Sequence, residues 1–307
     1  MHVFRHVQNV PAAFHGSVLA IGDFDGVHLG HQALLAHARR EAEMRGRPFA
    51  VLSFEPRQSE ARLTPLRAKM RLLAGQGVEA LFLLRHGPGQ VVQGRFVEEV
   101  LLKKLGICAL AMGEDLPSGD FGIWPAVAKA LGVAVTSVEA LSEGEEKIGA
   151  ARIHAALQKS RPDEAARLLG RCWAIEGRVL HGDGRGRTLS FPTANMLLGD
   201  HVAPAGGIYA VRVKIFDKGR VAARHNGVAN FGIRPMYRTT TPLLETHLFD
   251  FYGDLYGKYL SVELVAWLRP EARFAGPLEL IAQMDKDAAG ARRILSAAPI
   301  CSSAHQL

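Results

Sequence analysis

The hydrophobic pattern of this chain changes its period near residue 172, and that change decides what the chain can fold into. Before it, apolar runs such as residues 18–21, 49–54 and 80–84 alternate with helical patterns, which predicts strands buried on both faces and separated by helices. After it, residues 211–215 and 260–264 alternate apolar with polar side chains, as strands with one buried face do. We therefore predict an α/β protein with a parallel doubly wound sheet, followed by an antiparallel sheet or small barrel.

The same division predicts the domain boundaries. We expect residues 1–158 to form the first domain, residues 159–171 a linker helix, and residues 172–297 the second domain with a helix at its end. Residues 298–307 are predicted to be a disordered tail. A length of 307 residues suffices for two domains, each with its own core.

Composition narrows the class of function. Lys and Arg number 37 against 30 Asp and Glu, but they are scattered, so we expect small anionic ligands and no nucleic acid. The apolar runs of the chain are much shorter than the ~20 residues that a membrane-spanning helix needs, and the sequence shows no leader pattern. We therefore expect a cytoplasmic protein without a membrane partner. No Cys-x-x-Cys pair occurs, so no cysteine metal site is predicted. The oligomeric state is left open.

A turn and a helix start follow the first apolar run. Residues 22–31 read Gly-Asp-Phe-Asp-Gly-Val-His-Leu-Gly-His, and at such a place backbone N–H groups and the helix dipole favour an anion. His28 and His31 are three apart, so both imidazoles can reach the same phosphates during nucleotidyl transfer. An isolated histidine pair is more often helix surface, and the strand–turn–helix context favours the catalytic interpretation. The predicted nucleotide-binding residues here are Gly22, Asp23, Phe24, Asp25 and Gly30.

Residues 182–195 predict a second nucleotide site. Three glycines in five residues let the backbone approach phosphate oxygens, although such glycines alone are more typical of a hairpin. Thr193 and Asn195 are two apart, so on an extended segment their oxygens point the same way, which suits Mg²⁺ on a nucleotide. The Walker pattern is missing from the chain, so phosphoryl transfer would use another architecture. The residues predicted to bind ATP here are Gly182, Gly184, Gly186 and Arg187.

Together these motifs resemble a known family. The element at residues 22–31, the Phe-Glu-Pro strand end at residues 54–56 and the Pro-Thr-Ala-Asn element at residues 192–195 resemble the bacterial bifunctional riboflavin kinase and FAD synthetase family, over almost the whole chain. The resemblance implies a Rossmann-like nucleotidyltransferase domain that adenylylates FMN to FAD. It also implies a six-stranded barrel that uses ATP and Mg²⁺ to phosphorylate riboflavin to FMN.

The resemblance further implies roles for single residues. Thr193 and Asn195 match the family's Mg-nucleotide residues, and Glu245 matches its catalytic base. A carboxylate suits that task because the ribityl hydroxyl must lose a proton, whereas Glu245 taken alone would be an exposed strand residue. Arg269 and Phe274 match positions on the flavin side. Two positions beside this site depart from the family pattern, namely Ser190 and Met236.

The first domain departs more strongly. The family's Ile-Ser-Ser-Thr-x-[Ile/Val]-Arg element, whose hydroxyls and helix start hold phosphates, reads Ile-Gly-Ala-Ala-Arg-Ile-His at residues 148–154. Arg152 remains as a predicted nucleotide-binding residue. A hydrogen bond to a charged group contributes about 1.5–3 kcal/mol, so the lost hydroxyls would slow turnover and leave the fold intact.

We therefore predict a riboflavin kinase fused to an FMN adenylyltransferase-like domain of doubtful activity. Two alternatives stay open: a fully bifunctional enzyme with compensating substitutions, and a flavin or nucleotide sensor without turnover. A first domain that takes another nucleotide or a flavin analogue is a further possibility.

Overall fold

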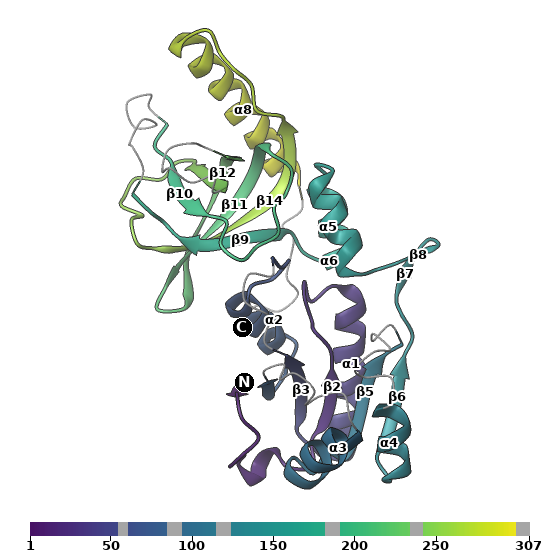
Figure 1. The fold of residues 1–307 in the computed structure, drawn as a ribbon. Helices are drawn as coiled ribbons and strands as arrows, with labels where there is room; N and C mark the ends of the chain where they lie inside the picture. Colours follow the sequence, from purple (N-terminus) through teal and green to yellow (C-terminus); the bar gives the residue numbers. More distant parts are fainter. Residues whose placement is uncertain (55–60, 85–93, 115–123, 182–190, 234–241, 299–307) are drawn as a thin grey trace. The chain divides into compact units, whose positions relative to one another are not determined.

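The computed structural model of the chain consists of two compact units (Figure 1). It describes all residues except 55–60, 85–93, 115–123, 182–190, 234–241 and 299–307. Of the described residues, those up to 149 form unit 1, except residues 61–63, which belong with residues 150–298 to unit 2. The predicted tail lies outside the described residues, apart from residue 298. Within the described part of the chain, no helix is both long and apolar enough to span a membrane.

Unit 1 is built on one parallel sheet with the strand order β1-β4-β3-β2-β5-β6. The strands are β1 (His2–Phe4), β2 (Val18–Ile21), β3 (Phe49–Phe54), β4 (Ala80–Leu84), β5 (Ala109–Gly113) and β6 (Ala134–Val138). Strands β2, β3 and β4 are buried along their whole length, because apolar side chains cover both faces of the sheet.

Helices cover both faces of this sheet. One face packs against α1 (Leu29–Arg45) and α2 (Leu66–Gly75), and the other against η2 (Val97–Lys104) and α4 (Trp124–Ala130). This arrangement confirms the predicted doubly wound parallel sheet. The remaining short elements are η1 (Ala12–Phe14), α3 (Gly94–Phe96), β7 (Ser142–Glu143) and β8 (Glu146–Lys147).

The strand order fixes where unit 1 can bind a ligand. Starting at β2, the chain adds β3 and β4 on one side, whereas β5 and β6 lie on the other side. In open α/β sheets, ligands bind beyond the carboxyl ends of the strands where the order reverses. The loop of residues 22–28, which we call the nucleotidyl loop after the role that the sequence predicts for it, leaves β2 at that point and leads into α1.

Unit 2 contains one antiparallel sheet in the order β10-β13-β12-β11-β14-β9. Its strands are β9 (Trp173–Arg178), β10 (Ala194–Leu197), β11 (Gly207–Asp217), β12 (Arg220–Ile233), β13 (Pro242–Leu248) and β14 (Tyr259–Arg269). The two edges meet where Leu180, just after β9, bridges to Asn195 of β10. The sheet and the final helix α8 (Pro277–Ala297) confirm the predicted antiparallel barrel with a C-terminal helix.

Two helices and a short segment complete unit 2. Helix α6 (Pro162–Leu169) lies within residues 159–171, where the linker helix is predicted, and it belongs with α5 (Ala150–Gln158) to this unit. The backbone N–H of Ala205 donates to the carbonyl of Leu157 at the end of α5, 3.0 Å away. Residues 61–63 also belong here, since Arg62 N–H donates to the Asp200 carbonyl at 2.8 Å.

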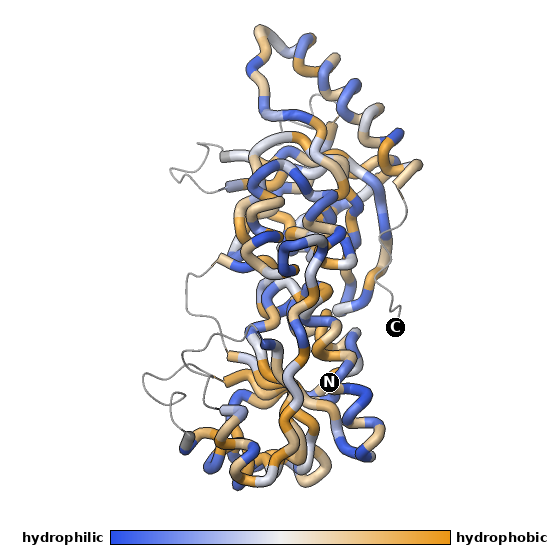
Figure 2. The backbone as a smooth tube through the Cα atoms, turned by 90° about the vertical axis from the view of Figure 1, so that its right-hand side faces the viewer, coloured by the Kyte–Doolittle hydropathy of each residue, from blue (hydrophilic) through white to orange (hydrophobic). Residues whose placement is uncertain are grey.

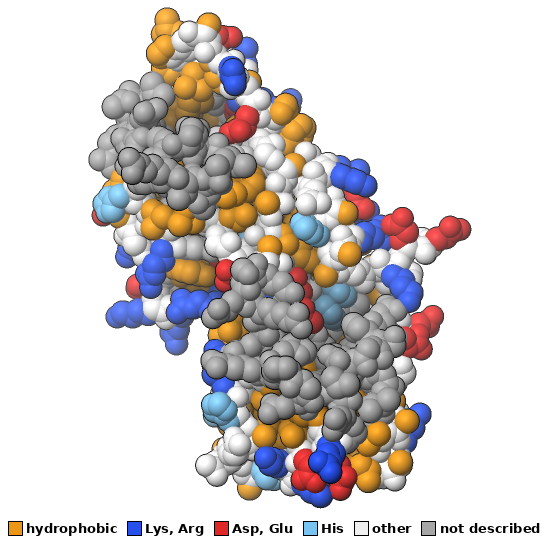
Figure 3. Space-filling model, viewed as in Figure 1, with side chains coloured by type: hydrophobic (Ala, Val, Ile, Leu, Met, Phe, Trp, Pro, Cys, Tyr) orange, Lys and Arg blue, Asp and Glu red, His pale blue; other side chains and the backbone are white. Residues whose placement is uncertain are grey.

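The two units differ in hydropathy as their sequences predict. Hydrophobic stretches gather in the strands of unit 1, whereas hydrophilic and hydrophobic residues alternate along much of unit 2 (Figure 2). Charges of both signs are spread over the visible face, with Lys and Arg gathered over the hairpin between β11 and β12 (Figure 3). The scattering of basic residues expected from the sequence therefore holds for most of that face.

Helix α8 packs on the outer face of the barrel. Its Ala291 and Leu295 contact Ala210 of β11 and Phe249, which follows β13. The Arg212 guanidinium donates to the carbonyl of Ala298, 2.8 Å away, and so satisfies a carbonyl at the end of the helix. The outer face of this sheet is therefore partly covered by α8.

Candidate active sites

Three polar residues of unit 2 lie side by side across neighbouring strands. Asn195 of β10 is paired with Glu245 of β13, and Glu245 is paired with Asn230 of β12. Directly paired residues in an antiparallel sheet point to the same face, with neighbouring strands about 4.8 Å apart. The barrel interior receives the alternate residues, such as Thr246 and Ala229. The polar row therefore lies on the outer face of the sheet.

Two amide oxygens in this row lack partners. Oδ1 of Asn195 and Oδ1 of Asn230 are buried, and in the described part of the chain neither accepts a hydrogen bond. A buried acceptor without a donor is costly, and in a native protein it points to a ligand, a water or an ion. Mg²⁺ binds oxygen ligands, so Asn195 Oδ1 is chemically suited to it. Thr193 lies half-buried just before β10.

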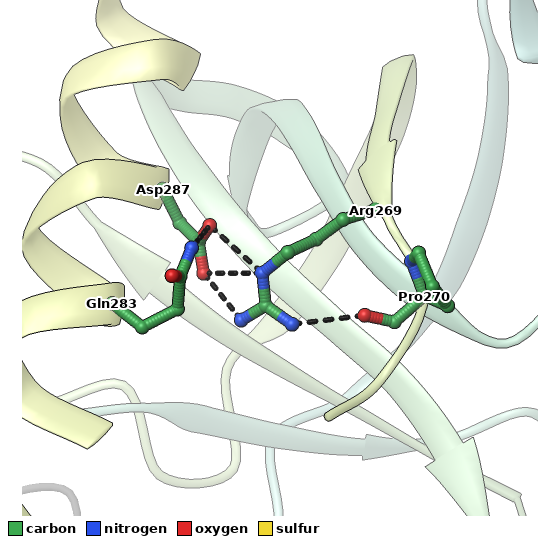
Figure 4. Close-up of polar contacts among 4 residues, drawn as sticks. All are labelled: Arg269, Pro270, Gln283 and Asp287. Atoms are coloured by element: carbon green, nitrogen blue, oxygen red, sulfur yellow. Dashed lines mark hydrogen bonds and ion pairs between the residues drawn. The ribbon is translucent and has the colours of Figure 1, made fainter. Parts of the chain in front are cut away.

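The row continues toward the final helix. Asn230 is paired with Ile208 of β11, and Ile208 with Arg269 of β14. Arg269 points to α8, where its Nη2 donates to Asp287 at 2.6 Å and its Nε to the same carboxylate at 3.0 Å (Figure 4). Gln283 donates to that carboxylate as well, at 2.9 Å. Arg269 is therefore oriented by α8.

The structure describes some of the other residues predicted for this site, and others lie outside the described residues. Phe274 lies with its ring centre 5.8 Å from the Arg269 guanidinium carbon, so the two predicted flavin-side residues are neighbours. Asn230 is not among the predicted site residues, because only the strand register shows that it stands beside Glu245. The predicted phosphate residues Gly182, Gly184, Gly186 and Arg187, with Ser190 and Met236, lie outside the described residues.

In unit 1 the two predicted catalytic histidines lie against each other at the start of α1. Their ring centres are 3.6 Å apart and nearly parallel. His28 is the N-cap of the helix, and its Nδ1 accepts a hydrogen bond from the His31 N–H at 3.3 Å. A Cβ at position 30 would lie 3.2 Å from the His28 ring. Gly30 has no side chain and therefore leaves space for that ring. The helix starts at Leu29, directly after its N-cap His28.

The nucleotidyl loop has a strained backbone. Phe24 and Val27 have φ angles of 55° and 41°, a region that residues with a Cβ rarely adopt. The Asp25 carboxylate accepts a hydrogen bond from the Thr64 N–H at 2.9 Å, and the Asp23 carbonyl accepts one from Ser53 at 3.1 Å. Gly22 and Phe24 are close, since a Cβ on Gly22 would lie 3.2 Å from the Phe24 ring.

Arg152 lies in α5 of unit 2 and forms an ion pair with Glu164 of α6 at 3.8 Å. It stands at the unspecified position of the family element, whereas His154 occupies the position of the family's arginine. Helix α5 begins with Ala150 and Ala151, so its first two residues carry no hydroxyl.

Comparisons with known proteins agree on both units. Residues 10–152 match the family described as FAD synthetase, and residues 169–295 match riboflavin kinase. The bifunctional riboflavin kinase/FMN adenylyltransferase of Escherichia coli (strain K12) is 38% identical over 308 residues, which cover 95% of this chain and 97% of that protein. The chain belongs to the bifunctional riboflavin kinase/FMN adenylyltransferase family.

Other members and one solved structure are consistent with this. The riboflavin kinase/FMN adenylyltransferase of Bacillus subtilis (strain 168) is 34% identical, over 91% of this chain and 93% of that protein. A crystal structure described as a macrolide-efflux protein from Streptococcus pneumoniae has a TM-score of 0.82 at 26% identity, over 97% of this chain and 99% of that one. The chain is accordingly an enzyme of flavin biosynthesis, an ATP-dependent kinase whose family acts on riboflavin and FMN.

Proposed function

We propose that unit 2 transfers the γ-phosphate of ATP to riboflavin and that Glu245 is the general base. The observation that carries this proposal is the row of Asn195, Glu245 and Asn230, in which a carboxylate is flanked by two buried amide oxygens without described partners. Burying two such acceptors is unfavourable unless a ligand satisfies them. A substrate-binding role accounts for the row, and a structural role does not.

The roles follow from the chemistry of phosphoryl transfer. Glu245 accepts the proton of the ribityl hydroxyl as its oxygen attacks the γ-phosphorus, and ADP leaves. Thr193 and Asn195 would hold Mg²⁺ through their side-chain oxygens, and the ion, when bound, neutralises charge on the phosphates. Arg269 and Phe274 would contact the flavin, with Arg269 held in place by Asp287.

For unit 1 we propose FMN adenylyltransferase activity that is slower than the kinase. His28 and His31 are stacked at the start of α1, where they can stabilise charge on the phosphates. Ala150 and Ala151 stand where the family element has hydroxyl donors, whereas both histidines are present. We therefore expect FAD synthesis to be reduced and not abolished.

Full bifunctionality is the second candidate. The identity of 38% to a bifunctional relative over 95% of the chain favours it, as does the geometry of the two histidines. A sensor without turnover is less favoured, because a binder has no need of a carboxylate placed between two ligand-facing amides.

A product assay tests these proposals. Purified protein is incubated with riboflavin, ATP and Mg²⁺, and riboflavin, FMN and FAD are separated by chromatography over time; a second reaction starts from FMN. FMN that accumulates ahead of FAD is the expected result. FAD that keeps pace with FMN would establish the fully bifunctional enzyme, and bound flavin without any product would establish the sensor.

A further inference from the structure

A buried lysine lies beneath the nucleotidyl loop. Lys69 of α2 is fully buried, with 0% of its surface exposed. Its Nζ donates to the carbonyl of Asp23 at 2.6 Å and lies 3.4 Å from the carboxylate of the same residue. That carboxylate belongs to a side chain that is mostly exposed. Moving an ammonium group out of water is costly, and an apolar residue of similar volume is often at least as stabilising at such a place.

A second buried donor reaches the same carbonyl. Ser53, at 0% exposure in β3, donates through Oγ to the Asp23 carbonyl at 3.1 Å. Two elements of the scaffold, β3 and α2, therefore hold one backbone oxygen of the loop. A carbonyl with two donors has little freedom to rotate, so the peptide plane after Asp23 is fixed.

The loop needs such support. Phe24 directly follows the fixed peptide and has a φ of 55°, and Val27 has a φ of 41°. Strained backbone of this kind persists only where its surroundings over-determine it, and it is concentrated at functional sites. Further along the loop, Gln32 donates to the Val27 carbonyl at 2.9 Å. Hydrogen bonds from buried or half-buried side chains thus hold the loop next to both strained residues.

We propose that Lys69 is a positioning residue for the nucleotide in unit 1. It fixes the Asp23 carbonyl, and through it the conformation in which the nucleotidyl loop presents its backbone N–H groups, His28 and His31 to the phosphates of a nucleoside triphosphate. Its charge also lies beneath the site where the anion binds. This inference rests on the proposed nucleotidyltransferase function of unit 1.

Three variants of the full-length protein test the proposal. Lys69→Met removes the donor and the charge at similar volume, Lys69→Arg keeps both, and Ser53→Ala removes the second donor alone. Two readouts are taken. The first is the steady-state kinetics of FAD formation from FMN, which gives kcat and the KM for ATP. The second is hydrogen–deuterium exchange of residues 22–31, measured with and without ATP and Mg²⁺. FMN formation in the same samples reports on unit 2, and thermal unfolding reports on whether each variant is folded.

We expect Lys69→Met to raise the KM for ATP and to lower kcat/KM by up to about 100-fold, as misplacement of a site by about 1 Å can do. It should also remove the protection of residues 22–31 by ATP, at an unchanged melting temperature and unchanged FMN formation. Lys69→Arg should keep most of the wild-type kcat/KM and most of the protection by ATP. Ser53→Ala should lose less of both than Lys69→Met does. A purely structural lysine would instead lower the melting temperature and leave the KM for ATP unchanged.

The proposal is overturned if folded Lys69→Met keeps the KM and the protection of the wild type. It is also overturned if ATP never protects residues 22–31 in the wild type. Protection without FAD formation would mean that the adenylyltransferase function has failed. In that case the exchange data of the three variants still decide the role of Lys69.

Discussion

The two candidate sites are built in different ways. In unit 2, the pairing of regular strands aligns Asn195, Glu245 and Asn230. In unit 1, the histidines lie where a loop with strained backbone enters α1, and particular buried side chains hold that loop in place. A site set by strand register tolerates many substitutions around it, because backbone hydrogen bonds maintain it. A loop site depends on individual side chains, so we expect single substitutions to cost more there.

The sharpest test of this comparison is Glu245→Gln, for which we expect the largest effect. Glutamine keeps the shape and removes the base, so FMN formation should fall by about 10²- to 10⁴-fold, while FAD formation from supplied FMN stays unchanged. Steady-state kinetics of both half-reactions measure this. The matched control is Glu43→Gln near the end of α1, an exposed glutamate whose replacement should leave both rates unchanged. Wild-type FMN formation by Glu245→Gln would remove Glu245 from the mechanism.

The reciprocal test in unit 1 is His28→Asn. Asparagine can still cap α1, but it lacks the imidazole that stabilises phosphate charge, so FAD formation should fall by about 10²- to 10³-fold. FMN formation should not change. His28→Ala removes the cap as well, and its melting temperature should be lower than that of His28→Asn. Equal FAD formation by His28→Asn and the wild type would show that the histidine only caps the helix.

The sequence predicted the regular parts of the structure better than the irregular parts. The alternating periods predicted both sheets, because apolar side chains must face a core. Strand β1 was missed, since its three residues give too short a pattern. Asn230 and Lys69 were missed for a deeper reason. Their roles depend on partners 15 and 46 residues away in sequence, Glu245 and Asp23, which only the folded chain brings near.

Restoring hydroxyls to the family element should raise FAD synthesis. The variant Gly149→Ser/Ala150→Ser/Ala151→Thr supplies donors at the start of α5, and each hydrogen bond to a charged phosphate contributes about 1.5–3 kcal/mol, or about tenfold or more in rate. A Cβ at Gly149 meets no atom of the described residues within 4 Å, so there is space for the serine. The control Gly149→Ala/Ala151→Val has nearly the same shape without hydroxyls and should not raise the rate. An equal gain in both variants would mean that helix stability, and not phosphate binding, limits unit 1.

The smallest effect is expected at Asp250, an exposed residue that pairs with Arg292 of α8 at 2.9 Å. The hydrogen bond from Arg292 lowers the pKa of Asp250 below its usual value. Because the folded pKa is the lower one, the pair stabilises the protein at neutral pH, and this contribution disappears as the pH falls through the folded pKa. Asp250→Asn should therefore lower the melting temperature slightly at pH 7, and the difference should shrink as the pH falls below the ordinary pKa of an aspartate.

The kinase rate of Asp250→Asn tests the contrast between the strand-based site of unit 2 and the loop-based site of unit 1. Asparagine also tolerates the positive φ of 55° at this position, so Asp250→Asn changes the charge without straining the backbone. If strand register sets the kinase site, kcat for FMN formation should be unchanged although α8 is held less firmly. A loss of kcat as large as that of Glu245→Gln would show that this site, too, depends on single side-chain contacts, and the contrast between the two units would then be lost.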